Sequence, residues 1–394
     1  MVYKNILSIL IIASTVGAMA QTDSAKSDSL LLLQIQSEMQ QQAPAVAAPQ
    51  QRVAASANPD ISVIGDFRGL YRSFGTHNAD AELHEAEFSF QSVVDPYARA
   101  DFFYSVGEDA KTGKFSGGIE EGYLTTLSLP WHLQLKAGRI KQDVGRVNPV
   151  HAHALPFINM PDAYVAFFGE EGLKGDGLSL SWLLPNRLFF QELTVEASSV
   201  DTESPTFERS STNNYLYLAH LKNFWDLSSN ATLELGLTAM QGENLQQKLT
   251  DIGAIDVTYK WKPVRFNTYK SVTFQNELYY SQSSFDSISS VAPALSPVTV
   301  NAIGFYSLLN VQVAKRFFLA GRYDYTNKPD DASFVRQSGT LTLGWYATEF
   351  QKIEIEGKYS AMNEAMAENN FEKSFVQANL RWIFVIGSHG AHQY

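Results

Sequence analysis

The chain of 394 residues contains no cysteine. No disulfide can therefore stabilise the fold, and no lipid can be attached to a cysteine after an export signal. Charged residues are also scarce, at 18% against about 25% in an average soluble protein. The net charge of -11 argues against binding to nucleic acid or to an anionic membrane surface.

Long apolar runs are missing after the N-terminus. The first residues have the three parts of a cleavable export signal: Lys4, an apolar stretch from Ile6 to Val16, and a small-residue cleavage site at Ala18-Met19-Ala20. We therefore expect residues 1–20 to be a signal peptide and the mature chain to begin near Gln21. No run of about 18 apolar residues follows, so no transmembrane helix is predicted.

Residues 21–57 differ in composition from the remainder. They begin with Ser and Asp, continue with four leucines from Leu30 to Leu33, and end in a stretch rich in Ala, Pro and Gln. This pattern predicts a periplasmic segment with a short helix over residues 29–42 and a flexible linker. A poorly ordered mature N-terminus and a short oligomeric coiled coil both remain open, because too few heptads are present to choose.

Aromatic residues, by contrast, are abundant, with 25 Phe, 18 Tyr and 6 Trp. From Asp60 onward, apolar and polar residues alternate with a period of two, as in the segment from Ile353 to Tyr359, where Glu354, Glu356 and Lys358 separate apolar side chains. Such alternation indicates strands with one apolar and one polar face. About sixteen such segments predict an all-β fold, a transmembrane antiparallel β-barrel over residues 58–394.

The predicted connections alternate between short and long. Short ones include Asp95-Pro96 and Ala314-Lys315, whereas long ones include residues 142–175 and Lys328 to Phe334. Short periplasmic turns on one rim and long extracellular loops on the other are typical of outer-membrane barrels. A β-sandwich or a propeller also has many short strands, but neither would separate its loops in this way.

Some segments resemble known outer-membrane proteins. The last predicted strand, Phe375 to Ile386, and the final Tyr394 resemble the signal that the barrel-assembly machinery recognises. Residues His84 to Phe88, Asp95 to Phe103 and Gly169 to Leu173 resemble an uncharacterised porin-like family, and Leu135 to Arg139 is distantly similar to phosphate-selective porins. The resemblance implies a porin-like barrel in the outer membrane of a Gram-negative bacterium, in contact with lipids and lipopolysaccharide, and a homotrimer.

The longest connection, residues 142–175, is the third long loop. In general porins the third outer loop folds back into the lumen, so we expect a constriction loop here, where charge and width select solutes. An ordinary external loop with solvated charges is the alternative. The candidate constriction residues are Arg139, Lys141, Arg146, His151, His153, Glu170, Glu171, Lys174 and Asp176.

His151 and His153 form an H-x-H pair within this loop. With Glu170 or Glu171 as a third ligand, they are a candidate Zn²⁺ site. Their protonation near the usual histidine pKa of about 6.5 is the alternative role, as a pH-dependent control of selectivity.

The sequence gives little support to an enzyme or a receptor. No Gly-x-Ser-x-Gly motif is present, and residues 21–57 are too few for the plug domain of a TonB-dependent receptor. No cofactor and no nucleic-acid partner are expected.

Acidic residues outnumber basic ones on the predicted polar strand faces, which favours a weak cation preference and argues against phosphate as the substrate. We predict a channel for passive diffusion of small hydrophilic solutes or ions, or else a plugged barrel that acts in binding, adhesion or metal handling.

Overall fold

A computed structural model describes residues 59–73, 79–109, 113–208, 214–266, 269–288, 295–364 and 372–387. The predicted signal peptide, the segment 21–57 with its helix, and Tyr394 lie outside these residues. All of the described residues belong to one compact unit, Asn58–Tyr394.

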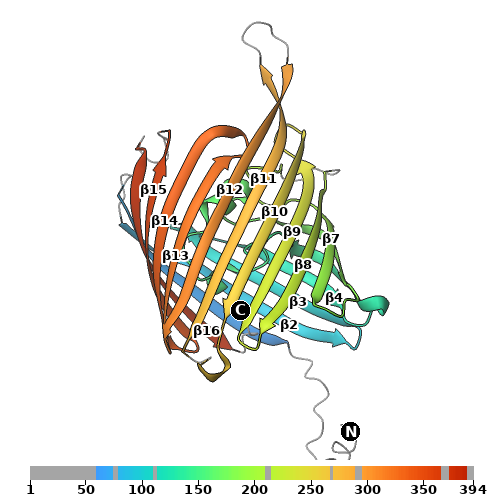
Figure 1. The fold of residues 1–394 in the computed structure, drawn as a ribbon, viewed down its shortest axis with the longest axis vertical. Coiled ribbons are helices and arrows are strands. Elements are labelled where there is room, and N and C mark those ends of the chain that lie inside the picture. Colours follow the sequence, from blue (N-terminus) through green and yellow to red (C-terminus); the bar gives the residue numbers. More distant parts are fainter. Residues whose placement is uncertain are drawn as a thin grey trace, which may run out of the picture. The chain divides into compact units, whose positions relative to one another are not determined.

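Sixteen antiparallel strands within the described residues form one closed barrel, which confirms the predicted fold class (Figure 1). The first eight strands are β1 (Asp60–Arg72), β2 (Ala79–Asp95), β3 (Ala98–Asp109), β4 (Lys114–Thr126), β5 (Leu133–Lys141), β6 (Lys174–Leu183), β7 (Phe190–Ser198) and β8 (Leu216–Ser228). The other eight are β9 (Ala231–Glu243), β10 (Leu249–Trp261), β11 (Ser271–Ile288), β12 (Leu295–Ala314), β13 (Phe317–Lys328), β14 (Asp331–Thr348), β15 (Gln351–Met362) and β16 (Ser374–Gly387).

The alternation seen in the sequence becomes an inside and an outside. On β15, Glu354 and Glu356 are 2% and 0% exposed, whereas Ile355 between them is 58% exposed. Polar side chains are thus buried in the barrel interior and apolar ones cover its outer face, the reverse of a soluble protein. This is the arrangement that a lipid environment requires.

The barrel closes through its first and last strands. β1 pairs with β16, with Phe67 opposite Trp382 and Ser62 opposite Gly387, while every other neighbour in the barrel is the next strand along the chain. Closure leaves no strand edge unpaired, as a barrel in a membrane needs. Since Ser62 and Gly387 are partners, the barrel begins and ends at the same rim, that of the short turns.

One predicted long connection is wrong. Residues Lys328 to Phe334 are mostly strand, because β13 ends at Lys328 and β14 begins at Asp331. The side-chain amide of Asn327 holds this hairpin by donating to the backbone oxygens of Ala332 and Phe334 at 3.1 and 2.8 Å.

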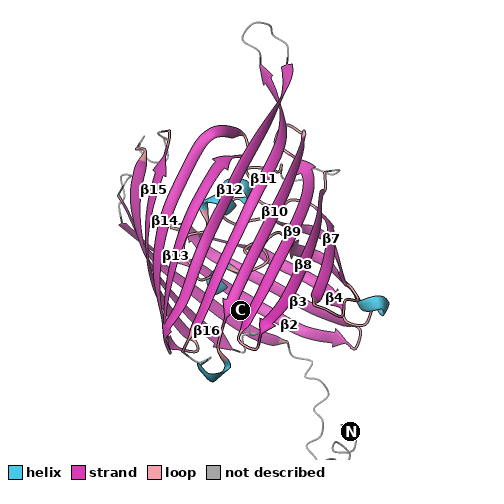
Figure 2. Cartoon of the chain, viewed as in Figure 1, coloured by secondary structure: helices cyan, strands magenta, loops and turns pink. Residues whose placement is uncertain are grey.

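Helices are few and short (Figure 2). The described residues contain one α-helix, α2 (Asp162–Phe168), and three 3₁₀ helices, η1 (Pro130–His132), η2 (Ala152–Ala154) and η3 (Val264–Phe266). None of these helices has the length and hydrophobicity to cross a membrane.

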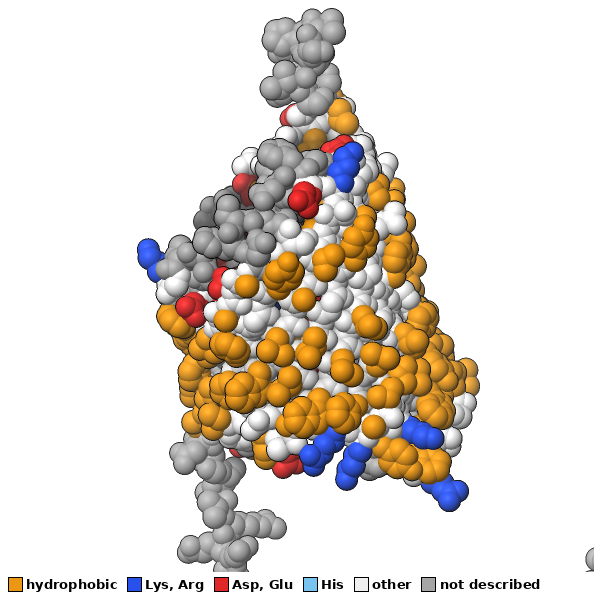
Figure 3. Space-filling view, turned by 90° about the vertical axis from the view of Figure 1, so that its left-hand side faces the viewer, with side chains coloured by type: hydrophobic (Ala, Val, Ile, Leu, Met, Phe, Trp, Pro, Cys, Tyr) orange, Lys and Arg blue, Asp and Glu red, His pale blue; other side chains and the backbone are white. Residues whose placement is uncertain are grey.

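The outer surface carries a broad band of apolar side chains, with Lys and Arg at its edge (Figure 3). Large aromatic residues lie exposed near the short turns, where outer-membrane barrels have an aromatic girdle at the membrane interface. They include Tyr97, Trp131, Phe190, Phe317, Trp345, Phe350 and Trp382. This surface agrees with the predicted outer-membrane location.

Candidate functional site: the loop inside the barrel

The connection between β5 and β6 folds into the barrel interior (Figure 1). β5 ends at Lys141 and β6 begins at Lys174, so the loop spans residues 142–173 and not the predicted 142–175. The loop is bonded to strands on opposite sides of the barrel. Its contacts reach β4 through His151, β9 through Arg146 and β15 through Asn159.

Helix α2 lies within this loop. The helix begins after Pro161, and its first residue, Asp162, places an acidic side chain in the first turn. Gly169 follows the last helical residue, and its φ of 86° favours glycine. Its sequence is short and apolar, with Ala163 and Phe167 fully buried. A seven-residue helix is not stable by itself, so packing must hold it in place.

An apolar core supplies that packing. The interior face of strands β8 to β13 carries apolar residues where a water-filled channel would have polar ones, and α2 packs on this patch. Phe168 meets Tyr279 of β11 edge to face at 5.1 Å between ring centres. Gly304 of β12 lets the helix approach, since a Cβ there would lie 2.9 Å from the Phe167 ring. The core from the loop comprises Val144, Val147, Leu155, Phe157, Ala163, Tyr164, Phe167, Phe168 and Leu173.

Charged side chains of the barrel wall bind the backbone of the loop between its two helices. Glu356 accepts hydrogen bonds of 2.9 Å from the backbone N–H groups of Ile158 and Asn159. Arg322 donates to the backbone oxygen of Asn159 at 2.8 Å, and Arg381 donates to that of Leu155 at 3.0 Å. These charged side chains supply hydrogen-bond partners for backbone N–H and C=O groups of the loop that have no partner in a neighbouring strand. Several wall charges are therefore occupied in holding the loop.

Asp162 adds a direct ion pair between loop and wall. Its carboxylate lies 2.7 Å from Nζ of Lys358 and 3.9 Å from the guanidinium of Arg336, and Ser338 donates a hydrogen bond to it. Burial raises the pKa of Asp162, but Lys358 and Arg336 outweigh burial and hold the pKa below its usual value.

The predicted histidine pair lies on the opposite side of the lumen from α2's apolar patch. His151 has Nδ1 2.9 Å from Oε2 of Glu87 and Nε2 2.9 Å from Oε2 of Glu121. His153 stacks on His151 at 5.7 Å between ring centres, and its Nδ1 lies 3.5 Å from Glu87. The partners of the pair are thus glutamates of β2 and β4, and not Glu170 or Glu171.

The charge state of His151 follows from these contacts. Burial and the nearby ammonium group of Lys141 lower the pKa of His151, but the carboxylates of Glu87 and Glu121 outweigh both and raise that pKa to about 10.

The other predicted constriction residues divide into two groups. Lys141 and Lys174 lie opposite each other at the start and end of the loop, and both approach Glu120, at 3.5 and 3.6 Å. The second group consists of exposed acids. Asp176 is 72% exposed and lies 3.9 Å from Arg139, Glu171 is 71% exposed beside Lys174, and Glu170 is exposed.

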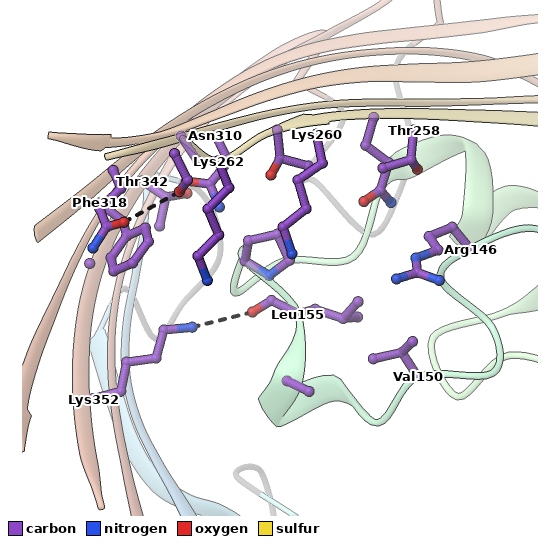
Figure 4. Close-up of a pocket in the computed structure, with 18 of the residues that line it drawn as sticks. Arg146, Val150, Leu155, Thr258, Lys260, Lys262, Asn310, Phe318, Thr342 and Lys352 are labelled. Atoms are coloured by element: carbon purple, nitrogen blue, oxygen red, sulfur yellow. Dashed lines mark hydrogen bonds between the residues drawn. The ribbon is translucent and has the colours of Figure 1, made fainter. Parts of the chain in front are cut away.

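A cavity of about 440 Å³ lies between the loop and the rim of short turns (Figure 4). Loop residues Arg146, Val150 and Leu155 face it on one side and wall residues on the other. Its lining includes two acids, Glu234 and Glu354, and both are paired with basic side chains. The basic residues that line it are Arg146, Lys260, Lys262, Lys315 and Lys352.

Three of these cations have no ion pair with the described residues. Arg146 lies 3.3 Å from Glu234 and Lys352 lies 2.8 Å from Glu354. Within the described parts of the chain, no ion pair involves Lys260, Lys262 or Lys315. The cavity therefore has an excess of positive charge, although acids predominate along the strands.

Solved structures of porins share this architecture. The anion-selective porin of Comamonas acidovorans is similar with a TM-score of 0.54 and 9% identity, over 83% of this chain and 98% of that one. The outer-membrane channel DcaP of Acinetobacter baumannii is similar with a TM-score of 0.55 and 11% identity, over 84% of this chain and 98% of that one. The trimer form of OmpT from Vibrio cholerae is similar with a TM-score of 0.52 and 9% identity, over 84% of this chain and 100% of that one. This chain has the fold of outer-membrane porins.

Sequence comparison adds a relative without a described function. An uncharacterised protein of Aquifex aeolicus is 25% identical over 397 aligned residues, which cover 85% of this chain and 80% of the relative. No protein-family model matches the chain.

Sequence reasoning placed the wall charges on the polar strand faces but did not pair them with the loop. The wall charges contact residues between 64 and 229 positions away; they are Glu87, Glu356, Arg322, Arg381 and Lys358. No spacing in the sequence signals such pairs. The one available signal was the run of polar residues on each strand face.

Proposed function

We propose that the protein is a porin-like channel for passive diffusion of small hydrophilic solutes or ions across the outer membrane of a Gram-negative bacterium, with loop 142–173 narrowing its lumen. The observation that carries the proposal is the loop itself, which is held inside a closed barrel by contacts to strands on opposite sides. A narrowing lined by charged side chains selects solutes by size and charge.

We further propose a preference for small anions. The support is the cavity beside the loop, where Lys260, Lys262 and Lys315 add positive charge and the acids are already paired. The weak cation preference predicted from strand composition stays untested. The ion pairs of the acids argue against a cation preference, because a carboxylate that is neutralised by a neighbouring cation contributes little to the electric field in the lumen.

A plugged barrel is the second candidate function. The apolar core between α2 and strands β8 to β13 favours it, because this core fills part of the interior and would be costly to open. Such a barrel would present a binding or adhesion surface. The expectation that the protein is not an enzyme stays untested.

Planar-bilayer recordings distinguish the two candidates. We expect the wild-type protein to give stepwise conductance, and a variant with residues 152–168 replaced by a short Gly/Ser linker to give larger steps. A plugged barrel would be silent as wild type and would conduct only after the replacement. Heat-modifiable gel mobility serves as the control for folding of both proteins.

We propose a homotrimer on the basis of fold, since OmpT of Vibrio cholerae, which shares this architecture, is described in a trimer form. Sedimentation of the detergent-solubilised protein, corrected for bound detergent, should give three chains per particle. A particle of one chain would contradict the trimer and leave the channel proposal intact.

A further inference from the structure

Three potential metal ligands converge where the loop meets strands β2 and β4, and His153 lies beside one of them. One oxygen each of Glu87 and Glu120 and one ring nitrogen of His151 lie within 4.8 Å of one another. Nδ1 of His151 is 2.9 Å from Glu87 and 3.7 Å from Glu120, and Nδ1 of His153 is 3.5 Å from Glu87. Ligand atoms around one Zn²⁺ ion each lie about 2.0–2.2 Å from it, so separations of this size suit a shared ion.

Glu121 occupies the position of a supporting group. Its carboxylate lies 2.9 Å from Nε2 of His151, on the opposite side of the ring from Glu87 and Glu120. A histidine that binds metal through one nitrogen commonly donates its other N–H to a carboxylate, which fixes the ring and its tautomer. Glu121 leaves Nδ1 of His151 directed at the two other glutamates.

Glu87 provides an independent observation. The residue is only 2% exposed, and neither of its carboxylate oxygens has a hydrogen bond of acceptable geometry among the described residues. Nδ1 of His151 and Nδ1 of His153 lie 2.9 and 3.5 Å from it. A buried carboxylate is costly without a partner, so its position requires a cation or proton between it and the rings.

The local charge also fits a divalent cation. Glu87, Glu120 and Glu121 carry three negative charges, which Lys141 and Lys174 reduce to one. Lys174 is itself shared with Glu171, at 2.8 Å. With both histidines neutral, the cluster therefore keeps an excess of negative charge that a cation can balance.

We propose that Glu87, Glu120, His151 and His153 bind one divalent transition-metal ion, with Zn²⁺ as the closest match to two imidazoles and two carboxylates. The site goes beyond the channel function, because metal binding does not require an open pore. A bound ion would join the loop to β2 and β4. Glu120 is shared with Lys141 and Lys174, so its contribution is smaller than that of Glu87.

Isothermal titration of the folded, detergent-solubilised protein with Zn²⁺ alone tests the site. We expect His151→Ala and Glu87→Gln to weaken binding by more than about 100-fold, and Glu121→Gln to weaken it by about 10- to 100-fold. His84→Ala is the matched control, because His84 also pairs with a carboxylate, Glu82 at 2.9 Å, outside this cluster. The C-terminal histidines lie outside the described residues and give the same background in every variant.

The proposal is overturned if the wild type does not bind Zn²⁺, or if His151→Ala and Glu87→Gln bind it as tightly as His84→Ala. Should both variants fail to fold, the visible spectrum of the Co²⁺-loaded wild type decides. Intense absorption of a four-coordinate ion supports the site, and the weak bands of an octahedral ion contradict it.

Discussion

Nζ of Lys358 on β15 donates a 2.7 Å hydrogen bond to the carboxylate of Asp162 in helix α2, across 196 positions of sequence. The side chains of Lys358 and Asp162 are 6% and 5% exposed. The pair therefore joins the inserted loop to the barrel wall in a place that water hardly reaches, where loss of one partner leaves the other charge buried.

Asp162→Asn should lower the free energy of unfolding by about 3–5 kcal/mol, because Lys358 would remain as an uncompensated buried charge. The double variant Asp162→Asn with Lys358→Met should recover part of this loss. Urea unfolding followed by tryptophan fluorescence measures both. Lys248→Met is the control, since Lys248 and Asp286 form a partly exposed pair at 3.0 Å that should contribute only about 0.2–1 kcal/mol.

The carboxylate of Asp162 should also make the free energy of unfolding depend on pH. Lys358 and Arg336 lower the pKa of Asp162 below its ordinary value of 3.8, against the opposing effect of burial, and Asp324 also faces the residue. Because the native pKa is depressed, this stabilisation is complete above the ordinary pKa and is lost as the pH falls through the native one. The difference in unfolding free energy between wild type and Asp162→Asn should be constant above about pH 5 and shrink in stronger acid. A difference that does not change with pH would contradict the assignment.

Gly145, at the start of the loop, should not tolerate a side chain. Its φ is 59°, and a Cβ there would lie 2.1 Å from Oε2 of Glu277 on β11. Gly145→Ala should cost at least about 1–2 kcal/mol from the left-handed backbone alone, and displacement of Glu277 adds to this. The same unfolding assay measures it, with Gly253→Ala as the control. No atom lies within 4 Å of a Cβ at Gly253, so its replacement should stay within about 0.5 kcal/mol of wild type.

The three lysines that line the cavity beside the loop should set ion preference. Replacement of Lys260, Lys262 and Lys315 by Gln should move the reversal potential in a KCl gradient away from anion preference. The control replaces Lys114 at the start of β4, Lys328 at the end of β13 and Lys373 just before β16, all on the rim opposite the short turns. It removes the same charge. Equal shifts in the two triple variants would show that net charge, and not this cavity, decides selectivity. Because screening acts over about 8 Å at physiological salt, the comparison is best made in dilute KCl.

The fold was predictable because it depends on a local property. A strand between lipid and lumen must alternate, so Ile355 and its neighbours Glu354 and Glu356 reveal their environment over three residues. Repetition of this pattern predicts a barrel and its strand number. The ends of the strands were less predictable. β13 extends to Lys328 and β14 begins at Asp331, in a stretch of polar residues whose composition is typical of a loop.

The sequence by itself determined the barrel, the long loop between β5 and β6, and the set of charged residues on the polar faces. Only the tertiary structure decided which charges act. Glu354 and Asp324 are paired with arginines, Glu356 binds loop backbone, and Lys260 faces the cavity without an ion pair to any described residue. The reason is that the field in the lumen depends on distances between residues far apart in sequence, and these distances are set when the loop packs on the wall.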